Sequence, residues 1–114
     1  MNQAIQGASN GVSFIVYLPF RPQVREVARK LFFEVIEEMS HEPDFISASV
    51  HEDMNDSNII VVYETWSCSR EHFIENHLTK AYRLAYEEQL PALLSGARRI
   101  EFLHRLAVYE SAPK

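Results

Sequence analysis

The stretch Ile59–Trp66, which reads IIVVYETW, constrains the fold more than any other part of this sequence. β-Branched and aromatic residues dominate it, and the turn-rich DMNDSN precedes it, so it predicts a strand. Its nearly continuous apolar character is typical of a strand covered on both faces. Because side chains alternate along a strand, Glu64 and Trp66 share one face with Ile60 and Val62. A carboxylate and an indole are tolerable on such a face if they border a cavity.

The remaining apolar patterns predict the order of the elements. Alternation with a period of two indicates strands, and recurrence at three- and four-residue spacing indicates amphipathic helices. The resulting order, β-α-β-β-α-β, is that of a ferredoxin-like α+β fold. The expected strands are residues 12–18, 45–52, 59–66 and 98–109, and the first expected helix is residues 23–39. A second helical region is expected to be capped by SCS at 67–69 and to continue after Thr79. Pro91 should kink or restart this region, and Gly96 should end it.

A chain of 114 residues suits one domain. We expect a single domain at residues 11–110, between a flexible N-terminal tail at 1–10 and a C-terminal tail at 111–114. Two helices on one face of a four-stranded sheet leave the other face uncovered, yet the strand 59–66 is apolar on both. The sequence therefore predicts a homodimer whose two sheets pack face to face as a dimeric α+β barrel.

Composition narrows the classes of partner and site. The net charge of −5 is spread along the chain, so neither nucleic acid nor a membrane is an expected partner. Cys68 is the only cysteine, which rules out an internal disulfide, and we expect no cysteine-based zinc site. Three glycines leave no nucleotide-binding loop. With neither a signal-peptide pattern at the N-terminus nor a long apolar run, the expected location is the cytoplasm.

Two short motifs carry a family resemblance. YETW closes the third expected strand, and FIENHLTKAY follows on the next helix. With DFISASVHED before them, they resemble the antibiotic biosynthesis monooxygenase domain, in its quinol-monooxygenase-like form, over residues 12–108. The resemblance implies a dimeric α+β barrel and either oxygenation without a cofactor or haem degradation. Val62 stands where the tailoring oxygenases carry an Asn, and Tyr17-Leu18 occupy the region where the haem-degrading branch carries one.

The same residues suggest a site. Glu64 and Trp66 share a strand face, and Phe73 and His77, four apart on a helix, share a stripe that is expected to face them. We expect His77 to be the general base, Trp66 to stack on a substrate ring and donate from its indole, and Glu64 to orient a His or hold a proton. The expected substrate-binding residues are Phe73, Tyr82, Tyr86, His104 and Val62.

The predicted function is a monooxygenase without cofactor or metal, acting with O2 on a hydroquinone or polyphenol. One alternative is a haem-binding or haem-degrading protein with His77 as axial ligand. The other is a non-catalytic dimeric domain that binds a small ligand, with Trp66 as a core aromatic and Glu64 in an ion pair such as one with Arg83. A metal triad is conceivable only through tertiary contact among His51, Glu64, His77 or His104.

Overall fold

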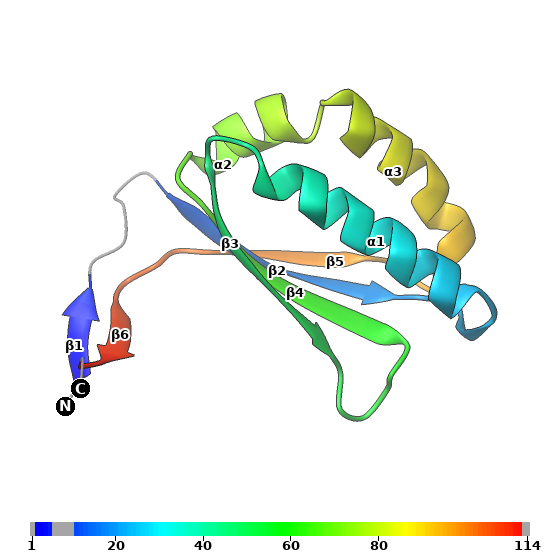
Figure 1. Ribbon diagram of the computed structural model, residues 1–114, viewed down its shortest axis with the longest axis horizontal. Coiled ribbons are helices and arrows are strands. Elements are labelled where there is room, and N and C mark those ends of the chain that lie inside the picture. Colours follow the sequence, from blue (N-terminus) through cyan, green and yellow to red (C-terminus); the bar gives the residue numbers. More distant parts are fainter. Residues whose placement is uncertain (1, 6–10, 113–114) are drawn as a thin grey trace.

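The computed structural model describes residues 2–5 and 11–112. Four strands form an antiparallel sheet in the order β3-β4-β2-β5, and the helices cover one of its faces (Figure 1), so the ferredoxin-like α+β fold is confirmed. The elements are β1 Asn2–Ile5, β2 Val12–Pro19, η1 Pro22–Val24, α1 Arg25–Ser40, β3 Phe45–Glu52, β4 Ile59–Trp66, α2 Arg70–His72, η2 Phe73–His77, α3 Ala81–Leu93, β5 Arg99–Leu103 and β6 Val108–Ser111.

The strand β4 lies inside the sheet, between β3 and β2. Val62 is opposite Val50 on one neighbour and Val16 on the other, and Glu64 is opposite Ala48 and Phe14. This register sets all the even-numbered β4 residues on the helix-covered face, where each is buried. The alternation expected from the sequence is therefore confirmed, and it carries Glu64 into the apolar layer.

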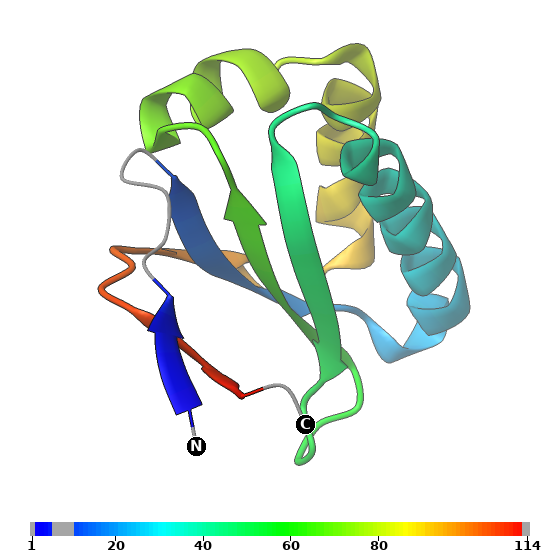
Figure 2. The ribbon, with the colours of Figure 1, turned by 60° about the vertical axis from the view of Figure 1, so that its left-hand side comes forward.

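The helix α1 follows its expected bounds closely and buries one stripe. Ala28, Phe32, Val35 and Met39 are buried against the sheet and α3, while Val27 is 64% exposed on the outer side. Figure 2 shows α1 and α3 side by side over the same sheet face. The core is thus one layer between the sheet and the two long helices.

The second helical region is broken into three parts. Ser69 caps its start, because its hydroxyl accepts a hydrogen bond from the His72 backbone N–H at 3.1 Å. The next turn is a π turn, in which the Leu78 N–H reaches back to the Phe73 carbonyl at 3.2 Å. Thr79 was expected to cap the continuation, but its hydroxyl donates backward to the Glu75 carbonyl, and α3 begins after Lys80. Pro91 lies within α3, which continues to Leu93 without restarting.

The ends of the chain differ from the sequence-based expectation. The single strand expected at 98–109 is two strands, β5 and β6, with residues 104–107 outside any strand. Residues 2–5 of the expected tail form β1, which pairs antiparallel with β6 in a separate two-stranded ladder (Figure 1). Isolated four-residue strands carry too weak a pattern for the sequence to show this pairing. Residues 6–10 and 113–114 lie outside the described residues.

Two valines of α1 offer a test of where the core lies. Val35→Ala removes two buried carbons and should lower the free energy of unfolding by about 2 kcal/mol. Val27→Ala makes the same change in helix propensity on the exposed side of the helix, so its effect should stay within about 0.5 kcal/mol. Urea unfolding followed by circular dichroism measures both. Equal effects in the two variants would contradict this placement of the core.

Candidate functional site

A cavity lies in the layer between the sheet and the helices. It has room for water-sized molecules in a volume of about 40 Å³. Phe14, Val62 and other strand residues form its floor, Phe73 closes one side, and residues of α1 and α3 form the roof. Most of the lining is apolar, and its polar and charged groups are Glu64, Arg83, Tyr86 and Arg98. Such a cavity, apolar with a few convergent polar groups, is the usual form of a small-molecule site.

Glu64 is the buried carboxylate of this cavity. Its side chain is 4% exposed, and this burial raises its pKa above the ordinary value. Two weaker effects oppose the shift: a hydrogen bond from the Trp66 indole at 3.1 Å and the positive charge of Arg83. Because burial dominates, Glu64 holds a proton more tightly than an exposed glutamate does. This is the property that a general base working near neutral pH needs.

Arg83 brings a positive charge to the same cavity. Its Nη1 contacts the Met39 sulfur at 3.8 Å, its Nη2 lies 3.8 Å from a Glu87 oxygen, and its guanidinium lies over the Tyr86 ring. Its Nε is buried and has no hydrogen-bond partner within residues 2–5 and 11–112. Arg98, by contrast, donates two hydrogen bonds to Glu87, at 2.6 and 2.5 Å. Arg83 is therefore the cation with donor capacity to spare for a ligand oxygen.

Tyr86 supplies a neutral phenol to the cavity wall. Burial raises its pKa to about 12, so the hydroxyl stays protonated and is available as a donor. Tyr86 and Val35 also border a second space, a groove of about 360 Å³ on the outer side of α1 and α3. These two side chains are thus a shared wall between the enclosed cavity and the open groove.

Trp66 separates the cavity from a second polar group. It is fully buried, and its indole N–H is occupied by the hydrogen bond to Glu64. Its ring lies 4.6 Å from the His77 ring, between centroids, and 5.0 Å from the Phe73 ring. Trp66 was expected to stack on a substrate and donate to it, but the indole does not line the cavity in this arrangement. It works instead as a packed support for Glu64.

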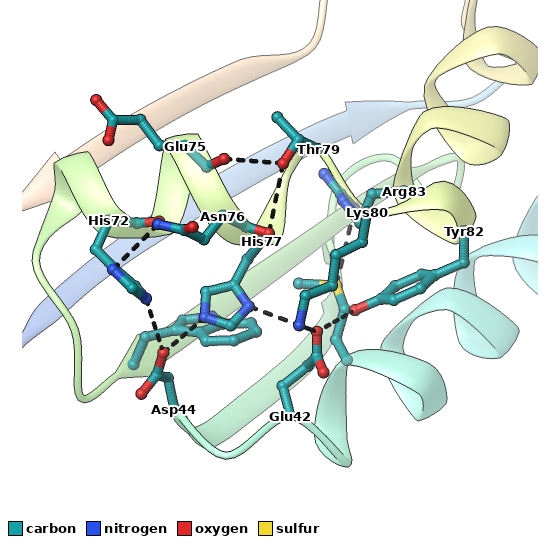
Figure 3. Close-up of polar contacts among 12 residues, drawn as sticks. Glu42, Asp44, His72, Glu75, Asn76, His77, Thr79, Lys80, Tyr82 and Arg83 are labelled. Carbon is teal, nitrogen blue, oxygen red and sulfur yellow. Dashed lines mark hydrogen bonds and ion pairs between the residues drawn. The ribbon is translucent and has the colours of Figure 1, made fainter.

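His77 packs on the Trp66 ring and belongs to a polar cluster with Asp44 and Glu42 (Figure 3). Its Nε2 is 2.8 Å from an Asp44 oxygen, and its Nδ1 is 3.5 Å from a Glu42 oxygen. The π turn buries Phe73 and His77 together, but only Phe73 reaches the cavity. The structure does not place His77, the expected base, among the cavity residues, because both of its ring nitrogens face carboxylates elsewhere.

The carboxylates around His77 come from the link between α1 and β3. The hydrogen bond from His77 is the main cause that lowers the pKa of Asp44, and hydrogen bonding by Lys80 is the main cause for Glu42. Sequence reasoning missed both acids, which lie in HEPD between the expected helix 23–39 and the expected strand 45–52. Two acids in that short segment were the available signal.

Two further expected binding residues lie away from the cavity. Tyr82 donates to Glu42 at 3.3 Å and borders the outer groove, and burial beside Glu42 raises its pKa to about 12. His104 was expected on the buried face of a fourth strand, but that strand ends at Leu103 and His104 is exposed. Among the expected substrate-binding residues, Val62, Phe73 and Tyr86 do line the cavity, and Glu64 joins them there.

Haem does not fit these residues. An axial ligand needs a free nitrogen that points into the haem pocket, whereas both nitrogens of His77 face Asp44 and Glu42. The cavity is also far smaller than a porphyrin.

Comparison with known proteins gives the family. The model of the antibiotic biosynthesis monooxygenase family matches residues 12–89. The chain belongs to this family. No curated protein matches it. The family match covers the sheet strands β2 to β4, the helix α1 and most of the second helical region. It therefore includes every cavity residue except Arg98, Ile100 and Phe102.

Solved structures of low sequence identity share the fold. A protein of Mycobacterium tuberculosis is 22% identical with a TM-score of 0.76, over 85% of this chain and 96% of that one. A protein of Pseudomonas aeruginosa is 21% identical with a TM-score of 0.76, over 89% and 99%. A crystal structure described as an antibiotic biosynthesis monooxygenase is 15% identical with a TM-score of 0.75, over 83% and 98%.

Within the described ranges, none of the helices is both long and apolar enough to cross a membrane.

The raised pKa of Glu64 predicts a pH-dependent effect of Glu64→Gln. A carboxyl whose pKa is higher in the folded protein makes folding less favourable as pH rises from its ordinary value of 4.5 through the raised one. The glutamine keeps the acceptor for Trp66 but cannot ionise. The variant should therefore gain stability relative to the wild type as pH rises from 4 to 8, as urea unfolding at each pH would show.

The control is Glu88→Gln, which removes one charge from an exposed position on α3. Subtracting its profile isolates the contribution of burial at Glu64. A Glu64→Gln profile that falls relative to the wild type over the same pH range would contradict a raised pKa.

Proposed function

We propose that this chain is a cofactor-independent monooxygenase for a hydroquinone or related polyphenol, bound in the cavity between the sheet and the helices. The observation that carries the proposal is Glu64, a buried carboxylate of raised pKa in an apolar cavity beside Arg83. Membership of the antibiotic biosynthesis monooxygenase family supports the reaction class. The hydroquinone substrate and the role given to each residue are part of the proposal.

The chemistry needs a base, an anion stabiliser and a dry site. Glu64 takes the phenolic proton, and Arg83, with its unused Nε–H, and the Tyr86 hydroxyl stabilise the phenolate. The anion is electron-rich enough to reduce O2, and a ring carbon then bonds to one oxygen atom. Loss of water from that adduct leaves a hydroxyquinone. One hydroquinone and one O2 thus give one hydroxyquinone and one water, and the substrate supplies every electron.

The bound ring needs more room than the cavity provides. A volume of about 40 Å³ holds water-sized molecules, and small-molecule pockets measure roughly 300–1,000 Å³. The groove on the other side of Val35 and Tyr86 measures about 360 Å³. Rotation of the Tyr86 side chain would join the two spaces, and rotamer changes of this kind are common on binding. The proposal therefore includes Tyr86 as the side chain that admits the ring.

The oxygenase is tested by oxygen uptake of the metal-stripped protein with a panel of hydroquinones. Uptake above the autoxidation rate is expected for the wild type. Glu64→Gln should lower kcat by about 10²–10⁴-fold, the usual contribution of a general base. Glu88→Gln, on the exposed side of α3, should leave kcat unchanged.

His77→Ala tests whether Glu64 or His77 is the general base. If Glu64 is the base, the His77 variant should retain more activity than Glu64→Gln, since His77 does not line the cavity. Full activity in Glu64→Gln would discard Glu64 as the base. Absence of uptake with every hydroquinone would favour a non-catalytic ligand-binding domain.

We also propose that two copies pair through the open face of the sheet. Ile15, Tyr17, Val61 and Tyr63 are half-buried there although no helix covers them. Arg99 lies over the Tyr17 ring, and Arg105 reaches the Ser13 and Thr65 hydroxyls on the same face. An apolar sheet face of this kind is stabilised when a second sheet packs on it.

The pairing predicts a dimer in sedimentation velocity at micromolar concentration. Val61→Glu places a charge in the middle of the open face and should give monomers. Val27→Glu places the same charge on the exposed side of α1 and should leave the dimer intact. A monomeric wild type, or a dimer that survives Val61→Glu, would contradict the pairing.

A further inference from the structure

A second group of chemically competent side chains lies behind Trp66, apart from the cavity. Asp44, Cys68 and His77 each offer one ligand atom, and these atoms all lie within 4.8 Å of one another. They come from three segments: the link before β3, the residues after β4 and the end of the π turn η2. A carboxylate, a thiol and an imidazole that converge from three segments form a mixed donor set, and the proposed oxygenase uses none of them as its base.

Within the described residues, the His77 ring makes one hydrogen bond, between Nε2 and Asp44, and leaves its other nitrogen without one. A neutral imidazole carries one N–H, yet Nε2 is 2.8 Å from Asp44 and Nδ1 is 3.5 Å from Glu42. His77 is 4% exposed, and its Nδ1 has no hydrogen-bond partner in the part of the chain described here. With the imidazole proton on Nδ1, facing Glu42, Nε2 carries a lone pair, and a cation can bind Nε2 and the Asp44 carboxylate in place of the hydrogen bond between them.

We propose that Asp44, Cys68 and His77 bind a divalent transition-metal ion of the zinc type. Sulfur, nitrogen and oxygen ligands together favour Zn²⁺ or its chemical relatives over Mg²⁺ and Ca²⁺, which prefer oxygen alone. Glu42 beside Nδ1 is the outer carboxylate that commonly orients a metal-binding histidine. Lys80 and Tyr82 hold that carboxylate in turn (Figure 3).

The geometry requires only small movements. At ordinary zinc bond lengths, tetrahedral ligand atoms lie about 3.3–3.6 Å apart. Nε2 and the Asp44 oxygen, at 2.8 Å, must separate slightly, while the longest separation in the group, within 4.8 Å, must close by about 1 Å. The backbone is already fixed, because the Ser67 N–H donates to the Asp44 carbonyl at 2.8 Å.

The fourth position is open to water or to His72. The His72 Nε2 lies 3.3 Å from the same Asp44 oxygen, on the exposed side of the cluster (Figure 3). Burial and the charge of Asp44 raise the pKa of the Cys68 thiol, and a bound metal would reverse that by taking the thiolate as ligand. The sequence pointed away from this site, since it offered one cysteine and the combinations considered were His51, Glu64, His77 and His104.

The test is cobalt binding to the untagged, metal-stripped full chain, with Zn²⁺ used to displace the cobalt. The wild type should bind one Co²⁺ and show a thiolate-to-cobalt charge-transfer band in the near ultraviolet, which Zn²⁺ abolishes. Cys68→Ala should lose the band, and Asp44→Asn should weaken binding by at least about tenfold. His104→Ala removes an exposed histidine outside the cluster and should bind like the wild type.

The outcomes are separate from those of the oxygenase assay, because the readout is a metal–sulfur spectrum. Circular dichroism confirms that each variant is folded before it is titrated. A wild type without the band, or a band that survives in Cys68→Ala, would overturn the site. The band together with its loss in Cys68→Ala supports it, whatever the protein does with hydroquinones.

Discussion

The pleat of β4 forces the Glu64 carboxylate into the apolar layer of this domain. The strand is paired on both edges, so its side chains cannot change face without a shift of the whole register. Ile60, Val62 and Trp66 must be buried, and Glu64 is carried in with them. A buried carboxylate without a partner is costly, and here the indole hydrogen bond and the charge of Arg83 offset part of that cost. Trp66 from the same strand and Arg83 from α3 are thus the two residues that stabilise this buried group.

Trp66 divides the polar groups of the interior into two sets. On one side lie Glu64, Arg83 and Tyr86 around the cavity, and on the other lie His77, Asp44 and Glu42. The indole contacts both sets, through its N–H to Glu64 and through its ring to His77. A change on one side can therefore reach the other through the position of a single ring. The motif that pairs Trp66 with His77 therefore does not by itself show which residue contacts a substrate, because the ring of Trp66 contacts polar groups on both sides.

The sequence predicted the fold well because periodicity decides it. The alternation in β4 and the apolar stripe of α1 gave the elements, their order and the face on which Glu64 lies. The site was predicted in part. Phe73 and His77 are four apart, but the π turn rotates their side chains away from the α-helical stripe, and no residue pattern marks such a turn. Asp44 is thirty-three positions from His77, so only tertiary contact shows the pair.

The ladder of β1 and β6 joins the two ends of the chain, with Asn2 opposite Ser111. Pairing segments so far apart closes a very long loop, and the entropic cost of that closure is large in an unfolded chain. The central sheet removes most of this cost once β2 and β5 are paired, because it brings the flanking segments near each other. This topology predicts that the ladder forms after the central sheet. We expect the ladder also to open first, so that its amide hydrogens exchange with solvent while the core stays folded.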